Sequence, residues 1–220
     1  NIGARDDKDY FKNSFESSTI IIGDSFAEGY GIEFDKTFIR IIEKNTNKKT
    51  INLAVAGTNP KDHLKRFEHF ITKNNYSEII YFFFPQNDFL INETKNKNDN
   101  LVKENRSIIN LNKIKLYLSN FTYTFNSLAT IKSLYFNRDK SYKNYSYNYN
   151  DTSIIDATYY FIEEILKTKN IKKTLFIVPA RKDFQFNKDN SLYKNLYWYK
   201  RLEEMSKKYN FKLVDIYDLF

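Results

Sequence analysis

Five short apolar runs recur along the chain, and most are separated by segments in which apolar residues follow a helical spacing. The runs cover residues 19–22, 50–55, 78–84, 173–179 and 211–216. The first is rich in β-branched residues and has no charged interruption, which is typical of a strand buried on both faces of a parallel sheet. Helices are predicted over residues 34–43, 60–73, 153–167 and 192–209. This alternation indicates an α/β fold, a three-layer flavodoxin-like parallel sheet of about five strands with helices on both faces.

Apolar positions within the predicted helices indicate which side chains pack on the sheet. The first and last helices are expected to contribute these core contacts: Phe38, Ile41, Ile42, Leu196, Tyr199 and Leu202. Their spacing of three or four residues places each set along one helix face.

A long segment between the third and fourth runs interrupts the strand–helix repeat. Residues 92–100 are polar, residues 108–135 carry apolar side chains at helical intervals, and residues 139–151 are rich in Tyr, Asn and Lys. We expect residues 1–220 to form a single domain in which residues 91–151 are a largely helical insertion. The two polar stretches are predicted to be loops. The insertion has two readings that the sequence leaves open, a cap over a pocket or a helical elaboration beside the core.

Small and polar residues follow the first three apolar runs directly. Asp24 and Ser25 come after the first run, Gly57 after the second, and Asn87 and Asp88 after the third. The carboxyl ends of parallel strands share one edge of the sheet, where ligands bind in open α/β folds. Each position also has a plain structural reading: a helix N-cap at the first, turn geometry at the glycine, and an Asn-Asp turn pair at the third.

The order and spacing of these three blocks resemble the SGNH (GDSL-type) hydrolase superfamily. The resemblance implies that Ser25 is a nucleophile, that Gly57 and Asn87 hold the oxyanion, and that Asp24 and Asp88 support them. It implies no cofactor and no metal. One departure is Pro85, which stands where the family usually has Gly at the start of its third block.

The fourth block of that family, a C-terminal Asp-x-x-His that supplies the orienting acid and the base, has no match. Asp215 and Asp218 reproduce the spacing, but a carboxylate cannot act as the imidazole. We therefore expect that the chain is truncated just before this block. His63 and His69 are the only histidines, and they stand six residues apart on one predicted helix. They are interpreted as ordinary surface or boundary residues rather than as the base.

The composition narrows the classes of function. There is no cysteine, which excludes disulfides and thiolate chemistry, and two histidines make a His-rich metal centre improbable. The formal net charge is +8, but the lysines are scattered, so nucleic-acid binding is not favoured.

The resemblance indicates a serine esterase or O-acyltransferase acting on an ester-linked acyl group, expected to be acetyl, of a small molecule or glycan. The alternative is a non-catalytic binding domain that keeps the fold without the chemistry. The opening Asn-Ile-Gly-Ala-Arg-Asp resembles the segment that some exported members carry after a membrane anchor. An exported or periplasmic protein with an upstream anchor is thus expected, and the oligomeric state stays open.

Overall fold

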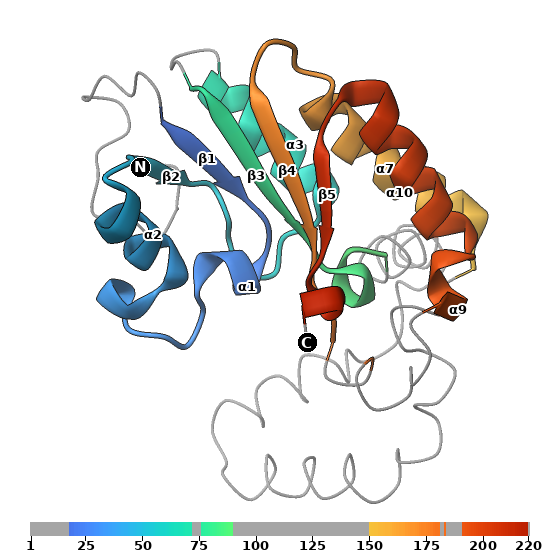
Figure 1. Cartoon of the computed structure of the whole chain (residues 1–220), viewed down its shortest axis with the longest axis horizontal. Helices are drawn as coiled ribbons and strands as arrows, with labels where there is room; N and C mark the ends of the chain where they lie inside the picture. Colours follow the sequence, from blue (N-terminus) through green and yellow to red (C-terminus); the bar gives the residue numbers. More distant parts are fainter. Residues whose placement is uncertain (1–17, 72–75, 90–149, 181–182, 184–190, 220) are drawn as a thin grey trace, which may run out of the picture.

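The sheet has five parallel strands, and their order places the first strand in the interior. The computed structural model describes residues 18–71, 76–89, 150–180, 183 and 191–219. Along the sheet the order is β2-β1-β3-β4-β5 (Figure 1). The strands are β1 (Thr19–Ile22), β2 (Thr50–Asn52), β3 (Glu78–Phe83), β4 (Lys172–Ile177) and β5 (Lys212–Asp215). This is the flavodoxin-like order expected from the sequence.

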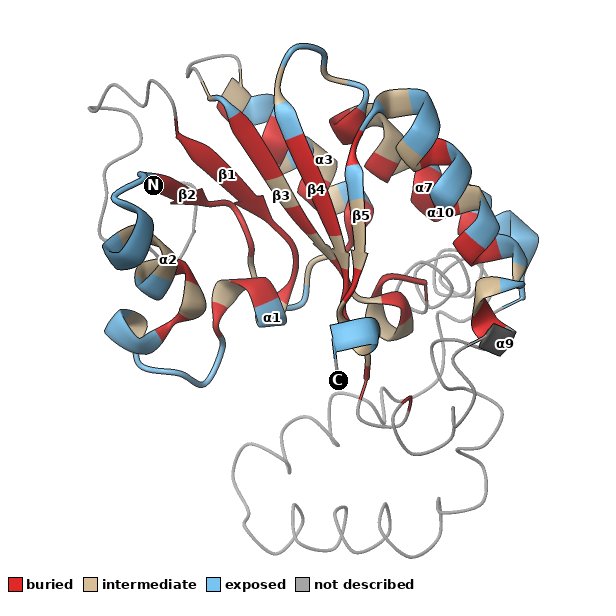
Figure 2. Ribbon diagram, in the orientation of Figure 1, coloured by how far each residue is buried: buried red, intermediate tan, exposed pale blue. Residues whose placement is uncertain are grey.

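Helices cover both faces of the sheet and make it a three-layer structure. One face carries α3 (Pro60–Ile71), α7 (Thr152–Leu166) and α10 (Tyr197–Tyr209), and the other carries α1 (Ser25–Glu28) and α2 (Phe38–Thr46). The remaining elements are short: η1 (Phe34–Lys36), α9 (Ser191–Lys194) and η4 (Ile216–Leu219). Figure 2 shows that β1 is buried along its whole length, as its unbroken apolar run predicts.

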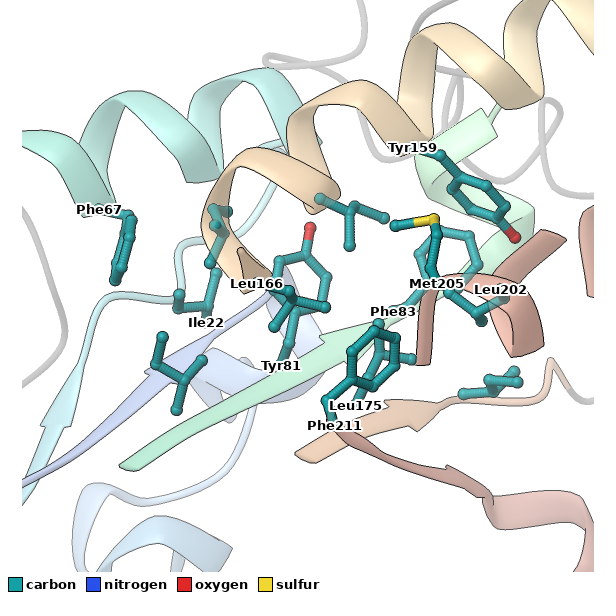
Figure 3. Packing of buried hydrophobic residues seen from close by; sticks show 14 of the residues in the cluster. Ile22, Phe67, Tyr81, Phe83, Tyr159, Leu166, Leu175, Leu202, Met205 and Phe211 are labelled. Carbon is teal, nitrogen blue, oxygen red and sulfur yellow. The ribbon is translucent and has the colours of Figure 1, made fainter. Parts of the chain in front are cut away.

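The two faces hold cores of different size. The larger core lies between β1, β3, β4 and the α3–α7–α10 layer, and Figure 3 shows Tyr81, Tyr159 and Met205 packed within it. The smaller core contains Ile21 and Ile39 against α1 and α2. Successive isoleucines of β1 alternate between the cores, because side chains along a strand point to opposite faces.

Two helices differ from their predicted form. The segment over residues 34–43 divides into η1 and α2, so the buried side chain of α2 is Ile39, while Ile41 is 48% exposed. The prediction of Ile41 as a core contact is therefore wrong, because the 3₁₀ turn delays the start of the helix and rotates its inner face. The last helix is also broken, into α9 and α10, but Tyr199 and Leu202 are buried as expected.

Most of the predicted insertion, residues 90–149, lies outside the described residues, and so do the expected loops at 92–100 and over most of 139–151. Asp151 is described, and its side chain caps α7 by accepting hydrogen bonds from the N–H groups of Ser153 and Ile154. Within the described ranges no helix is long and apolar enough to cross a membrane.

Candidate active site

The strand order creates a switch point between β1 and β3. From β1 the chain goes to β2 on one side, and it later places β3 on the other side. Connections that leave in opposite directions open a crevice at the carboxyl ends of the two central strands, which is where ligands bind in folds of this order. The turns carrying Ser25 and Asn87 follow these two strands.

The turn after β1 exposes Ser25 and leaves its hydroxyl unused. Asp24 is the N-cap of α1, and its Oδ1 accepts a hydrogen bond from Phe26 N at 3.0 Å. The capping role that could have explained Ser25 therefore belongs to Asp24. Ser25 is half-buried, and its hydroxyl makes no hydrogen bond with the described residues.

Gly23 allows this turn to pack closely. A Cβ at this position would lie 2.7 Å from Ala27 Cβ and 3.1 Å from Phe82 Cβ. Any larger residue would push α1 away from β3, so the glycine fixes how deeply the Ser25 turn sits at the edge of the sheet.

The turn after β3 is a short helical stretch held by Asp88. The N–H of Phe84 donates to Asp88 Oδ2 at 2.9 Å, and the carbonyl of Phe84 accepts from Asn87 N and Asp88 N at 3.0 and 2.9 Å. Pro85 occupies the first helical position, where the absence of an N–H costs nothing. Proline in place of the family's usual glycine is thus compatible with this turn.

Asp24 connects the two turns across the switch point. Its Oδ2 accepts a hydrogen bond from Asn87 Nδ2 at 2.9 Å. An amide nitrogen has two donors, so one N–H of Asn87 is fixed by Asp24 and a second is left for another acceptor. The structure brings Asn87 next to the residue that precedes Ser25; its role as an oxyanion donor stays a prediction.

The Gly57 turn lies against the same region. Ala56 N donates to Glu28 Oε2 of α1 at 2.6 Å, and Val55 N donates to the carbonyl of Gly23 at 3.3 Å. Gly57 has φ of 75°, in the left-handed region that favours glycine, and it is exposed. Its N–H makes no hydrogen bond within the described part of the chain. The turn geometry therefore requires the glycine and also leaves a backbone donor available.

Two buried carboxyl groups lie beneath these turns. Asp24 and Asp88 are 2% and 1% exposed. Burial raises the pKa of both groups, and the negative charge of Asp24 raises the pKa of Asp88 further. Hydrogen bonds from Asn87 and from the N–H of Phe26 act in the opposite direction on the pKa of Asp24. Both carboxyl groups hold turns through hydrogen bonds: Asp24 to Phe26 and Asn87, and Asp88 to Phe84.

The expectation that both histidines are surface or boundary residues is wrong for His63. His63 is 1% exposed, with Nδ1 2.8 Å from Tyr81 Oη and Nε2 3.1 Å from Thr58 Oγ1. Burial lowers its pKa to about 3. A sequence signal existed, because His63 stands four and seven residues before the buried Phe67 and Phe70, on one helix face. His69 is exposed, as expected.

The Asp215 and Asp218 pair makes structural contacts. Asp215 ends β5, is buried, and accepts hydrogen bonds from Tyr193 Oη at 2.7 Å and Tyr217 N at 3.0 Å. Asp218 forms an ion pair with Lys194 at 2.8 Å. β5 lies three strands from β1 in the sheet, roughly 14 Å at the usual strand spacing. Among the described residues no group of His, Asp and Glu could hold a metal ion.

Several solved structures are similar to this chain. A member of the lipolytic G-D-S-L family from Veillonella parvula matches at a TM-score of 0.48 and 11% identity over 90% of this chain and 77% of its own. AlinE4, a SGNH-hydrolase family esterase, matches at a TM-score of 0.47 and 14% identity, over 92% of this chain and 77% of its own. The esterase EstA of a Pseudoalteromonas species matches at a TM-score of 0.42 and 11% identity, over 91% of this chain and 77% of its own. No family model matches the sequence, and no curated protein does.

Proposed function

We propose that the chain is an ester hydrolase of the SGNH type and that Ser25 is its nucleophile. The observation that carries the proposal is the Asp24–Asn87 hydrogen bond at the switch point. It joins the turn that exposes an unbonded serine hydroxyl to the turn that offers a neutral amide. Helix capping and turn formation account for the residues of each turn taken separately. They do not account for the buried carboxyl group of Asp24 that links the two turns.

The three turns supply the donors that acyl transfer needs. Attack of Ser25 Oγ on an ester carbonyl turns the carbonyl oxygen into an oxyanion, which the N–H groups of Ser25 and Gly57 and the second N–H of Asn87 would bind. Donors fixed before reaction stabilise that charge without reorganising, and loss of one such donor typically lowers kcat by roughly 10² to 10³. Asp24 fixes Asn87 in this way.

Ser25 also needs a proton acceptor, and neither histidine fits that role. His63 already uses both ring nitrogens, on Thr58 and Tyr81. His69 lies in the last turn of α3. Because α3 returns the chain to the amino edge of the sheet, His69 lies at the edge opposite Ser25. In the superfamily that the chain resembles, an Asp-x-x-His pair supplies the base and its orienting acid.

The proposed reaction has two halves. In the first, Ser25 Oγ forms a bond to the acyl carbon, the ester C–O bond breaks, and the alcohol leaves with the serine proton. In the second, water attacks the acyl-serine and releases the acid, or a sugar hydroxyl attacks and accepts the acyl group. Acetyl esters of carbohydrates are the substrates we propose, with hydrolysis and acyl transfer as the two outcomes. One alternative is kept because neither of the two histidines is placed to act as the base: a binding domain that recognises an ester without cleaving it.

The test uses the 220-residue chain with p-nitrophenyl acetate, with and without added imidazole, which can accept the proton of Ser25. Formation of an acetyl adduct is followed by intact mass and located by peptide mapping. We expect imidazole to increase acetylation of Ser25, Ser25→Ala to abolish this adduct, and Asn87→Ala to slow it by about tenfold or more. Ser77→Ala is the matched control, since Ser77 is exposed where the chain enters β3 at the amino edge.

The result can contradict the proposal in two ways. Acetylation of several serines at similar rates would show that Ser25 has no special reactivity. Binding of p-nitrophenyl acetate without any Ser25 adduct, at every imidazole concentration, would favour the binding domain.

A further inference from the structure

His63 sits in a buried chain of hydrogen bonds that joins three elements. Tyr81 on β3 contacts Nδ1 of His63 on α3, and Nε2 of His63 contacts Oγ1 of Thr58 in the turn after β2. Thr58 Oγ1 lies 2.5 Å from the carbonyl of Val55. Tyr81 is fully buried and Thr58 is half-buried, so the chain runs from the core to the edge of the site.

The contacts determine where the protons are. The carbonyl of Val55 can only accept, so the hydroxyl proton of Thr58 is donated to it. Thr58 Oγ1 must then accept from His63, which places a proton on Nε2. A neutral imidazole has no second proton, so Nδ1 accepts from the hydroxyl of Tyr81. His63 is therefore held as one neutral tautomer, with its proton on Nε2.

This chain ends one residue from Gly57. The turn is fixed on one side by Ala56 N bonded to Glu28, and on the other by Thr58 bonded to His63 and Val55. Gly57 itself is exposed, and a Cβ built on it would meet no atom of the described residues within 4 Å. The direction of its N–H is set by its two neighbours.

We propose that His63 is a positioning residue of the active site, which orients the Gly57 N–H through Thr58 and does not touch the substrate. Its catalytic consequence rests on the proposed function, but its structural part, one fixed tautomer that holds the Gly57 turn, does not. The two parts are measured separately.

The surroundings of His63 keep it neutral. On α3, Asp62 favours the charged ring and Arg66 opposes it, while burial opposes it most strongly. Tyr81 faces it from β3, and the buried Asp88 and Asp24 act on the Tyr81 hydroxyl. The ring therefore stays in one state across the pH range in which an exposed histidine titrates.

The first experiment is NMR of the chain labelled with ¹⁵N at histidine. The chain has two histidines, so two sets of ring-nitrogen signals are expected. His69, which is exposed on the same helix, is the internal control. We expect the Nε2 of His63 to show a protonated-type shift and its Nδ1 an unprotonated-type shift, and we expect both to stay constant from about pH 5 to 8. Titration of His63 in this range, or the opposite tautomer, would overturn the proposal.

The second experiment removes one hydroxyl. Thr58→Val keeps the side-chain shape and breaks the link to His63, and Thr58→Ser restores it. With ¹⁵N-glycine labelling the chain gives five amide signals, and Gly57→Ala identifies that of Gly57. We expect Thr58→Val to shift the Gly57 signal and Thr58→Ser to return it toward the wild type. An unchanged Gly57 signal in Thr58→Val would refute the positioning role, whether or not the protein is an esterase.

The catalytic part uses the acetylation rate of Ser25 with imidazole present. If His63 positions the oxyanion donor, Thr58→Val should lower the maximal rate by roughly tenfold to a hundredfold, with little change in the half-saturating ester concentration. An unaltered rate of Ser25 acetylation in Thr58→Val would refute the catalytic part of the proposal and leave the structural part standing. Absence of Ser25 acetylation in the wild type would instead count against the proposed function.

Discussion

Replacement of Asp88 by Asn should make the protein more stable at neutral pH. Asp88 is buried, its Oδ2 accepts from Phe84 N, and its Oδ1 has no hydrogen-bond partner among the described residues. Burial and the neighbouring Asp24 raise its pKa well above 3.8. An Asn at this position keeps an acceptor for Phe84 N and carries no charge, so it resembles the protonated acid.

The sign and size follow from proton linkage. Because the folded state holds the Asp88 proton to higher pH than the unfolded state, the unfolding free energy falls as pH rises from about 4 toward the folded pKa. One proton is worth at most about 1.4 kcal/mol per pH unit, so the loss between pH 5 and 7 reaches at most about 2.7 kcal/mol. Asp88→Asn removes this loss. The pKa of Asp24 is also raised, so Asp24 still lowers the unfolding free energy of both proteins as pH rises.

Urea denaturation at half-unit steps from pH 5 to 7 measures the difference. The difference in unfolding free energy between the variant and the wild type should grow in favour of the variant from pH 5 to pH 7, by up to the amount above. Asp35→Asn, in the exposed η1 turn, is the control for the loss of one carboxyl charge at the surface. Groups such as Glu78, whose pKa is lowered, act equally in both proteins and cancel from the difference. Parallel slopes for Asp88→Asn and wild type would refute the assignment of the raised pKa to Asp88.

Two glycine substitutions near the site should lower the stability of the protein for different reasons. Gly23→Ala should lower the unfolding free energy by about 1–3 kcal/mol, because its Cβ would overlap Ala27 and Phe82; a loss below about 0.5 kcal/mol in urea denaturation would contradict this close packing. The added Cβ of Gly57→Ala would meet no atom of the described residues within 4 Å, so this substitution should cost about 1–2 kcal/mol through the left-handed backbone alone. Gly57→Asn, which tolerates that conformation better, should recover part of the loss.

The sheet could be predicted from the sequence because its strands are short, apolar and separated by helices. The run at residues 19–22 had only one reading, a strand buried on both faces, and the two cores that share its isoleucines confirm it. The predicted strand over residues 50–55 was longer than β2, yet Leu53 N and Val55 N still donate to the carbonyls of Ile21 and Gly23. The regular strand β2 ends at Asn52, but the hydrogen bonds between this segment and β1 continue past that residue.

Helix register was harder to predict, because it depends on where the first turn closes. In residues 34–46 the chain forms a 3₁₀ turn before α2 begins at Phe38, and Thr37 Oγ1 donates back to the carbonyl of Phe34 at 2.9 Å. Nothing in the apolar spacing distinguishes this start from a helix that begins at residue 34. The predicted inner face was rotated for that reason, and Ile41 faces solvent.

The position of the candidate site could be predicted, but its internal bonds could not. Ser25, Gly57 and Asn87 each follow a strand, so the parallel topology alone brings their turns to one edge. The pairing of Asp24 with Asn87 depends on the order β2-β1-β3, which places two turns separated by 63 residues side by side. His63 was misjudged because its separation from His69 was weighed only for a role as the base, although its spacing from Phe67 matched the buried face of α3.

Polar side chains fix the turns at the carboxyl edge, and two of them act on the Gly57 turn. Glu28 of α1 binds the Gly57 turn, Asp24 binds Asn87, and His63 of α3 binds Thr58. Buried polar groups are costly unless they are paired, and Asp24 and His63 are almost completely buried. A fold that needed these turns only as connections could have joined the strands with apolar contacts and exposed loops. Retaining paired polar groups here is consistent with a need for fixed backbone and amide donors, which is the requirement that a developing oxyanion imposes.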